Sequence, residues 1–233
     1  MVVDNSGRAL AGEAGARDFG ASIIENKRNL GFGAAVNQGI RQSRAEYVAV
    51  LNDDAEAHPA WLAALVKAMD ANPGVGMCAS QVRLAGTGLL DSAGMLLCAD
   101  GSSKQRGHGQ PAAGYPALEE ALFPSGSAAL YRRRMLDETG LFDEDFFLYC
   151  EDTDLGLRAR WAGWRCLYVP GAVVDHRYSH SAGRASALKA YYVERNRVFT
   201  VLKNFPLRML LRVPFAAVAR YWWHLVSMRS GRN

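Results

Sequence analysis

The sequence predicts an α/β fold in which strands alternate with helices around one main core. Over the first eighty residues, short apolar runs that stop at turn residues alternate with segments whose apolar positions recur at helical spacing. This pattern is typical of strands joined by helices. Apolar residues make up 49% of the 233 residues, which is enough for one core with a helical appendage. We therefore expect a main domain at 1–182 and a helical tail at 183–233.

The early elements follow from where their patterns stop. Val2 and Val3 lead into the turn-forming run 4–7, which predicts the end of a strand. The continuous apolar run at 47–51 stops abruptly at Asn52 and predicts a buried parallel strand. Further expected elements are a strand at 23–25, a helix at 34–43 and a helix from Pro59 to about 72. Ligands bind at the carboxyl ends of the strands in such sheets.

Two later segments have a different character. Residues 101–114 are rich in Gly, Ser and Pro, which predicts a flexible loop. Residues 167–170 predict another strand, and after about residue 182 the sequence becomes basic, aromatic and helical in pattern.

Cysteine usage and the N-terminus bear on the compartment. Cys78, Cys98, Cys150 and Cys166 show no CxxC pairing and lie in apolar sequence, which predicts buried thiols in a reducing compartment. The N-terminus has neither the basic region nor the apolar region of a signal peptide. A cytoplasmic location is expected.

Charge is divided unevenly along the chain. Residues 184–233 carry ten Lys or Arg and a single acid, Glu194, so this tail has a net charge of +9 and the preceding residues have −5. This asymmetry predicts a basic end that meets an anionic surface, either a membrane or nucleic acid. Nucleic acid is the weaker candidate and is not an expected partner, because no recognised binding module accompanies the charge.

The tail leaves two hypotheses open. Arg208, Arg212 and Arg220 interrupt the apolar runs before they reach membrane-spanning length. An interfacial helix with Trp222 and Trp223 near the lipid headgroups is one interpretation, with the protein peripheral at the inner face of the membrane. An ordinary amphipathic helix packed on the main domain or on a partner subunit is the other.

Asn52, Asp53 and Asp54 form an acidic cluster at the end of an apolar strand. Carboxylates in that place can hold Mg²⁺ or Mn²⁺ against a diphosphate, because both ions prefer oxygen ligands and neutralise charge on a leaving phosphate. Two acids after a strand can equally form a turn or a helix N-cap. The cluster alone does not decide between these roles.

A second acidic cluster lies among aromatic residues, at Glu151, Asp152 and Asp154, with Arg158 at helical spacing. Apolar surroundings raise the pKa of a carboxylate and suit it to accept a proton from a hydroxyl. The alternative is that these acids begin and cap a helix. Both interpretations are compatible if Asp154 caps the helix while Asp152 faces a site.

Two further motifs are weaker. His176 closes an apolar strand, where it is either structural or the completing ligand of a carboxylate metal site. The glycine-bearing run at 26–39 matches neither a phosphate loop nor a dinucleotide fingerprint. Its glycines before a helix show only that a ligand can approach the backbone closely.

In this order and spacing, six segments together resemble the inverting family 2 glycosyltransferases with a GT-A fold, especially rhamnosyltransferase-like members. The segments are VVDNS at 2–6, NLGFGAAVNQGI at 29–40, YVAVLNDDAE at 47–56, FPSGSAALYRR at 123–133, GLFDEDFFLYCEDTDLGLRARWAGW at 140–164 and YVPGAVVDH at 168–176. The resemblance implies a Rossmann-like, mixed central sheet flanked by helices, followed by the C-terminal amphipathic helical segment.

The resemblance also implies roles for individual residues. Nucleotide contacts are implied at Asp4, Asn29, Gly31, Asn37 and Asp53. Metal ligands are implied at Asp54, His176 and Asn52, where Asn52 replaces the usual first aspartate. Asp152 falls at the general base, and contacts to the donor sugar or acceptor are implied at Gly126, Ser127, Glu151 and Arg158.

The activity implied by the resemblance is transfer of a sugar, with rhamnose as the preferred guess, from a nucleotide diphosphate donor to a hydroxyl. The acceptor would be a glycan or a lipid-linked glycan in cell-surface polysaccharide synthesis, and Mg²⁺ or Mn²⁺ would be the cofactor. Asp152 would deprotonate the hydroxyl in a direct, inverting displacement.

Family members normally begin one strand earlier than VVDNS, so we expect that the usual first strand is missing here. A truncated, non-catalytic nucleotide-sugar binding or scaffolding remnant is therefore the alternative function. A nucleotidyltransferase is a rival enzyme, but the glycine-rich basic phosphate loop expected near its start is absent from this sequence.

Overall fold

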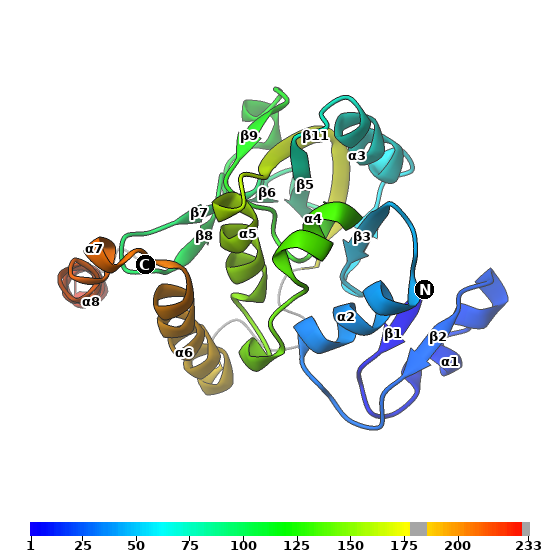
Figure 1. Ribbon diagram of the computed structural model, residues 1–233, viewed down its shortest axis with the longest axis horizontal. Helices are drawn as coiled ribbons and strands as arrows, with labels where there is room; N and C mark the ends of the chain where they lie inside the picture. The colour runs from blue at the N-terminus through cyan, green and yellow to red at the C-terminus, as the bar shows by residue number, and fades with distance from the viewer. Residues whose placement is uncertain (178–185, 230–233) are drawn as a thin grey trace.

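A computed structural model describes residues 1–177 and 186–229 (Figure 1). Among these residues, a seven-stranded sheet has the order β3-β10-β5-β11-β4, with β6 paired to β5 and β9 paired to β11. Its strands are β3 (Tyr47–Leu51), β4 (Ala55–Ala57), β5 (Val75–Leu84), β6 (Leu90–Ser92), β9 (Glu119–Ala121), β10 (Ala128–Arg132) and β11 (Arg165–His176). The expected division at 182/183 lies outside the described residues.

The sheet is mixed, as the resemblance implies. The long strands β5 and β11 are parallel, whereas β10 runs antiparallel to both β3 and β5. β11 includes both the predicted strand at 167–170 and the segment that ends at His176. The expectation of a buried parallel strand at 47–51 is wrong. β3 has one antiparallel partner and Leu51 is 39% exposed, because β3 lies at the edge of this sheet.

Helices cover both faces of the sheet because strand residues alternate between two cores. On β10, Ala129 and Tyr131 join one core, while Ala128 and Leu130 join the other. The first core is covered by α2 (Phe32–Gln42), α4 (Arg133–Thr139), α5 (Glu151–Trp161) and α6 (Ala187–Asn204). The second is covered by α3 (Trp61–Asp70).

The N-terminal elements form a separate small unit beside α2. β1 (Val2–Asp4) and β2 (Ile23–Glu25) form a parallel pair, and α1 (Leu10–Glu13) and the 3-10 turn η1 (Ala16–Phe19) lie between them in the chain. Within the described residues, no strand pairing joins this pair to the larger sheet. The predicted strand ends at Asp4 and at Glu25 are confirmed.

The segment at 101–114 is more ordered than a flexible loop. It contains β8 (Ser103–Gln105), which pairs with β7 (Met95–Leu97), and the 3-10 turn η2 (Ala112–Gly114). Arg106 anchors it, because its Nε donates to the carbonyl of Ala93 and its guanidinium lies over the Tyr168 ring. The glycines and proline of this segment therefore make turns in a packed structure.

The tail is helical, as predicted, and consists of α6, α7 (Leu207–Leu210) and α8 (Val213–Arg229). It contacts the main domain at Asp100, which pairs with Arg220 of α8 at 2.7 Å and accepts from Arg197 of α6 through its carbonyl at 2.7 Å. No helix among the described residues has the length and apolar character needed to cross a membrane.

Gly101 provides a test of how α6 packs. Its φ is +86°, and a Cβ there would lie 2.2 Å from Val201 Cγ2. Gly109 has a φ of +73° with open space around it. Both Gly101→Ala and Gly109→Ala place a Cβ on a left-handed backbone, which lowers the free energy of unfolding by about 1–2 kcal/mol. Gly101→Ala adds an overpacking cost of about 1–3 kcal/mol. Chemical denaturation should therefore show a larger loss for Gly101→Ala. Equal losses would contradict the α6 contact.

Candidate active site

The turn at 124–127 brings the two acidic clusters of the sequence together. The Asn52 N–H donates to the Ser127 carbonyl at 2.9 Å, and the Gly126 N–H donates to Asp152 Oδ2 at 2.9 Å. The pairing of β10 with β3, which sets Ala128 opposite Leu51, fixes the first contact. Asn52, Gly126, Ser127 and Asp152 are thus neighbours although they span one hundred residues of sequence.

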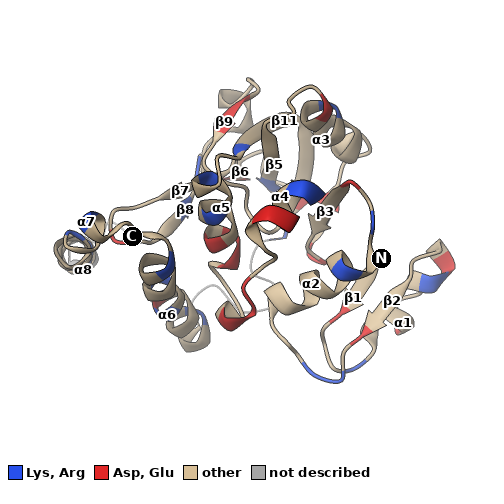
Figure 2. Ribbon diagram, viewed as in Figure 1, with Lys and Arg blue, Asp and Glu red and all other residues tan. Residues whose placement is uncertain are grey.

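Asp152 lies in the first turn of α5. Its Oδ1 accepts from the Thr153 N–H at 2.6 Å, and its side chain is partly buried. Glu151, Asp152 and Asp154 all lie in this first turn, and Figure 2 shows the acidic start and basic far end of α5. Acidic side chains at the start of a helix and basic ones at its end interact favourably with the helix dipole. Burial raises the pKa of Asp152, although the N–H groups of Gly126 and Thr153 oppose the shift.

Glu151 is the more deeply buried of the adjacent pair. It is 6% exposed, and its Oε2 has no hydrogen-bond partner among the described residues. Burial, with the neighbouring charge of Asp152, raises the pKa of Glu151 to about 8. Near neutral pH, Glu151 is therefore protonated, while Asp152 accepts two N–H donors that favour its ionised form. The two acids thus differ in their contacts, because Asp152 has N–H donors on its carboxylate and Glu151 has no partner on Oε2.

His176 lies between two carboxylates. Its Nε2 is 3.1 Å from Asp54 Oδ1, and its Nδ1 is 2.8 Å from Asp91 Oδ2. The antiparallel pairing of β11 with β4 sets His176 opposite Ala55 and so brings it beside Asp54. Burial opposes the charged imidazole, but hydrogen bonds and charges from Asp91 and Asp54 outweigh it and raise the pKa of His176.

Asp91 is a site residue that the sequence interpretation missed. Its carboxylate is 2% exposed, and it also lies 3.2 Å from His108 Nδ1. A carboxylate that hydrogen-bonds one ring nitrogen of a histidine fixes the orientation of the ring, and so decides which nitrogen faces the other neighbours. A lone acid inside the apolar run LLDSAGML was the available signal, because buried charges need partners.

The loop before α2 contacts both the N-terminal unit and the region of Asp152. Asn5, also missed, donates to Asn29 Oδ1 at 2.9 Å and to the Gly31 carbonyl at 3.0 Å. The Phe32 N–H donates to the Phe147 carbonyl at 2.7 Å. Asn29 is exposed, whereas Gly31 is buried.

Asp4 has a clear structural role. Its Oδ1 accepts from Ser6, and its Oδ2 accepts from the Ala11 N–H at 2.7 Å. These hydrogen bonds, led by that of Ala11, lower the pKa of Asp4. Asp53 is exposed at the edge of the acidic cluster. Contacts of Asp4, Asn29, Gly31 and Asp53 with a nucleotide stay predictions.

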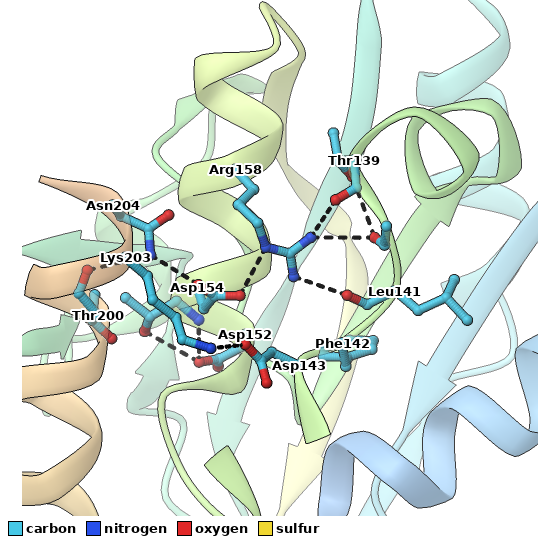
Figure 3. A network of polar contacts seen from close by, with 12 residues as sticks. Thr139, Leu141, Phe142, Asp143, Asp152, Asp154, Arg158, Thr200, Lys203 and Asn204 are labelled. Atoms are coloured by element: carbon cyan, nitrogen blue, oxygen red, sulfur yellow. Dashed lines mark hydrogen bonds and ion pairs between the residues drawn. The ribbon is translucent and has the colours of Figure 1, made fainter. Parts of the chain in front are cut away.

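Two predicted site residues are held by contacts within the fold, and their predicted ligand contacts stay predictions. Asn37 is 1% exposed and exchanges hydrogen bonds with Phe142, so it joins α2 to the following segment. Arg158 pairs with Asp154 at 2.8 Å and donates to the carbonyls of 139–141 (Figure 3). Arg158 therefore fixes α5 against α4, because all three nitrogens of its guanidinium donate hydrogen bonds within the fold.

The polar groups of the site gather beside the sheet. They are the base candidate Asp152, the carboxylate–histidine pair Asp54–His176 and the turn with the Gly126 N–H, and no group of three or more His, Cys, Asp or Glu that could hold a metal by itself occurs among the described residues. The fold defines the class of the protein as α/β of the GT-A type. The chain belongs to glycosyl transferase family 2, which it matches over residues 2–140.

Individual relatives agree with this membership. An N-acetylglucosaminyl-diphospho-decaprenol L-rhamnosyltransferase of Mycobacterium tuberculosis is 33% identical over 195 residues, a match that covers 73% of this chain and 64% of the relative. The chain thus spans a little under two thirds of that relative's length.

Solved structures support the fold. The structure of GalNAc-T7 with UDP, GalNAc and Mn²⁺ has a TM-score of 0.66 at 15% identity and covers 86% of this chain and 42% of that one. The Pyrobaculum calidifontis mannosyltransferase PcManGT, with GDP-Man and Mn²⁺, has a TM-score of 0.52 at 16% identity and covers 95% of this chain and 72% of that one.

The burial of Glu151 predicts a pH dependence of stability. Because its pKa is about 8 in the folded state and about 4.3 in an unfolded chain, the folded state binds more protons between these values, and stability falls as pH rises through this window. Glu151→Gln should remove much of this fall, so the variant gains over the wild type as pH rises. Urea denaturation at pH 5 and pH 9 measures it. A fall of equal size in both proteins would contradict the prediction.

Proposed function

We propose that the chain transfers a sugar from a nucleotide diphosphate donor to a hydroxyl of a lipid-linked glycan, with inversion at the anomeric carbon. The observation that carries the proposal is Asp152, a partly buried carboxylate held by the Gly126 N–H at the start of α5 and adjacent to the turn that reaches Asn52. Rhamnose is the proposed sugar because the similar mycobacterial protein is an L-rhamnosyltransferase.

Asp152 is proposed to act as the general base. The acceptor oxygen forms its bond to the anomeric carbon while the bond from that carbon to the diphosphate oxygen breaks. The bonding pair leaves with the nucleoside diphosphate, and the hydroxyl proton moves to a carboxylate oxygen of Asp152. The two N–H groups on Asp152 orient it without using all its lone pairs, since each carboxylate oxygen can accept twice. Gly126 and Ser127 would border the sugar.

A divalent cation fits Asp54 and His176. Their facing atoms are 3.1 Å apart, which is close to the spacing of two adjacent ligands that each lie about 2.1 Å from an octahedral ion. Asp91 would keep the proton on Nδ1 of His176 and leave the Nε2 lone pair for the metal. Asn52 would be a weaker oxygen ligand. The ion, Mg²⁺ or Mn²⁺, would supply neutralisation of the charge on the leaving diphosphate.

Release of nucleoside diphosphate from a panel of nucleotide sugars, with and without Mn²⁺ or Mg²⁺, tests the enzyme. Asp152→Asn should lower acceptor-dependent release by about 10²–10⁴-fold, and chelation of the metal should abolish release. Asp145→Asn, which changes an exposed acid in the 3-10 turn η3 (Glu144–Phe146), is the matched control and should keep activity. Donor binding without turnover would favour a binding or scaffolding function instead.

The tail is proposed to lie on the inner face of the membrane, where a lipid-linked acceptor would be presented. Exposed apolar residues recur every three or four positions from α7 through the turn at Leu211 into α8, and we name them the apolar stripe. It comprises Leu207 (77% exposed), Leu211 (72%), Phe215 (78%), Val218 (69%) and Trp222 (68%). Water-exposed apolar stripes of this size mark contact surfaces.

Charge favours an anionic lipid surface as the occupant of the apolar stripe. The sequence contains no Asp or Glu after Glu194, whereas Arg208 and Arg212 flank the stripe. A second copy docked on the same stripe would bring these arginines together without acidic partners. Anionic headgroups would instead attract them, with Trp222 and Trp223 at the level of the headgroups.

Vesicle sedimentation tests this contact. The chain should bind phosphatidylglycerol vesicles, bind phosphatidylcholine vesicles weakly, and release from the former in high salt. Trp222→Ser with Trp223→Ser should reduce binding by about tenfold or more. Phe19→Ser, at an 89% exposed aromatic outside the tail, is the matched control and should bind normally. Dimerisation that is lost in the tryptophan variant, without vesicle binding, would contradict the proposal.

A further inference from the structure

The loop that precedes Asp152 has an unusual backbone. Phe147, Tyr149 and Cys150 have φ values of 62°, 69° and 68°. Left-handed conformations at residues other than glycine cost on the order of 1–3 kcal/mol each, so contacts from elsewhere must hold the loop at 147–150 in place. Because Cys150 directly precedes the first residue of α5, this loop also decides where α5 begins.

Asn196 of α6 supplies those contacts. Its side chain is 0% exposed. Its Nδ2 donates to the carbonyls of Phe146 and Leu148 at 2.8 Å each and of Tyr149 at 2.6 Å. The loop thus brings three carbonyls to one side-chain amide, whose N–H bonds they share. Loss of these donors would remove the buried group that ties the three carbonyls together.

The same loop is held from its other side by the start of α2. The Phe147 carbonyl accepts from the Phe32 N–H at 2.7 Å, and a Cβ at Gly31 would lie 2.4 Å from that carbonyl. The Phe147 ring stacks on Tyr192 of α6, with centroids 5.2 Å apart. The loop is thus fixed between α6 and the start of α2.

A second asparagine joins α6 to α5 further along. Asn204 Nδ2 donates to Asp154 Oδ1 at 2.8 Å, and Lys203 pairs with Asp143 (Figure 3). These contacts hold Asp154, in the first turn of α5, and the segment before the helix. Asn196 differs from Asn204 because it holds the three carbonyls that come immediately before the N-terminal turn of α5, where Asp152 lies.

We propose that Asn196 is a positioning residue for the reaction, which holds the left-handed loop 147–150 and thereby fixes the start of α5 and the direction of the Asp152 carboxylate. This inference rests on the proposed role of Asp152 as base. Asn196 touches neither Asp152 nor a ligand, so its effect passes through the backbone of Phe146 to Tyr149.

The experiment compares Asn196→Asp and Asn196→Ala with Val201→Ala. The first variant keeps the shape of the side chain but replaces its donors with acceptors. The third truncates another buried side chain of the same helix, which packs against Gly101, and controls for loss of stability. For each folded variant, kcat, KM for the donor and the pH profile of kcat are measured.

Both Asn196 variants should lower kcat by about 10- to 100-fold, as expected for a misplaced reacting group, with KM for the donor within about twofold of the wild type. The acid limb of the pH profile should move to lower pH, because a released loop exposes Asp152 to water. Val201→Ala should lower the unfolding midpoint while its kcat and pH profile stay close to those of the wild type.

If the Asn196 variants do not fold, Arg195→Gln provides the second test, because the Arg195 Nη2 donates to the neighbouring carbonyls of Asp145 and Phe146 at 2.8 Å each. It should lower kcat by about threefold or more and move the acid limb in the same direction. Unchanged kcat and pH profile in the folded variants, with Asp152→Asn inactive, would overturn the inference. Full activity of Asp152→Asn would overturn the proposed base instead.

Discussion

The partly buried carboxylate of Asp152 is the constraint on which the rest of the site depends. Burial raises the pKa of Asp152, and the N–H groups of Gly126 and Thr153 oppose that shift while they hold the carboxylate in place. Glu151, which lies deeper and has an unpartnered oxygen, takes the neutral form. A carboxylate with a raised pKa that is held by N–H donors is suited to accept a proton from a hydroxyl.

Backbone pairing within the mixed sheet brings the rest of the site to that carboxylate. The edge strand β3 ends at Asn52, and its pairing with β10 places Asn52 against the Ser127 carbonyl. The pairing of β4 with β11 places Asp54 against His176. Because backbone hydrogen bonds set these positions, the polar side chains meet without long flexible connections. Such rigid support is what a site needs to hold a diphosphate and a hydroxyl in reacting geometry.

The C-terminal helices connect the site to the outer surface. α6 packs on α5, and through Asn196 and Asn204 it contacts both the loop before the proposed base and the helix that carries it. Further along the tail, Asp100 pairs with Arg220 and so holds α8 against the main domain while the apolar stripe stays exposed. Under the proposed membrane contact, this arrangement would hold the site at a fixed height above the lipid surface.

The sequence by itself determined the α/β class, the ends of the early strands, the helical tail and the family, because these follow from local periodicity and from motifs whose order is preserved. It also pointed to the two acidic clusters and His176. It could not determine that 47–51 is an edge strand, that Asn37 and Arg158 serve packing, or that Asp91, Asn5 and Asn196 contact the site region. Those facts depend on which distant backbone groups lie opposite a side chain, and strand pairing and helix packing decide that only in the folded chain.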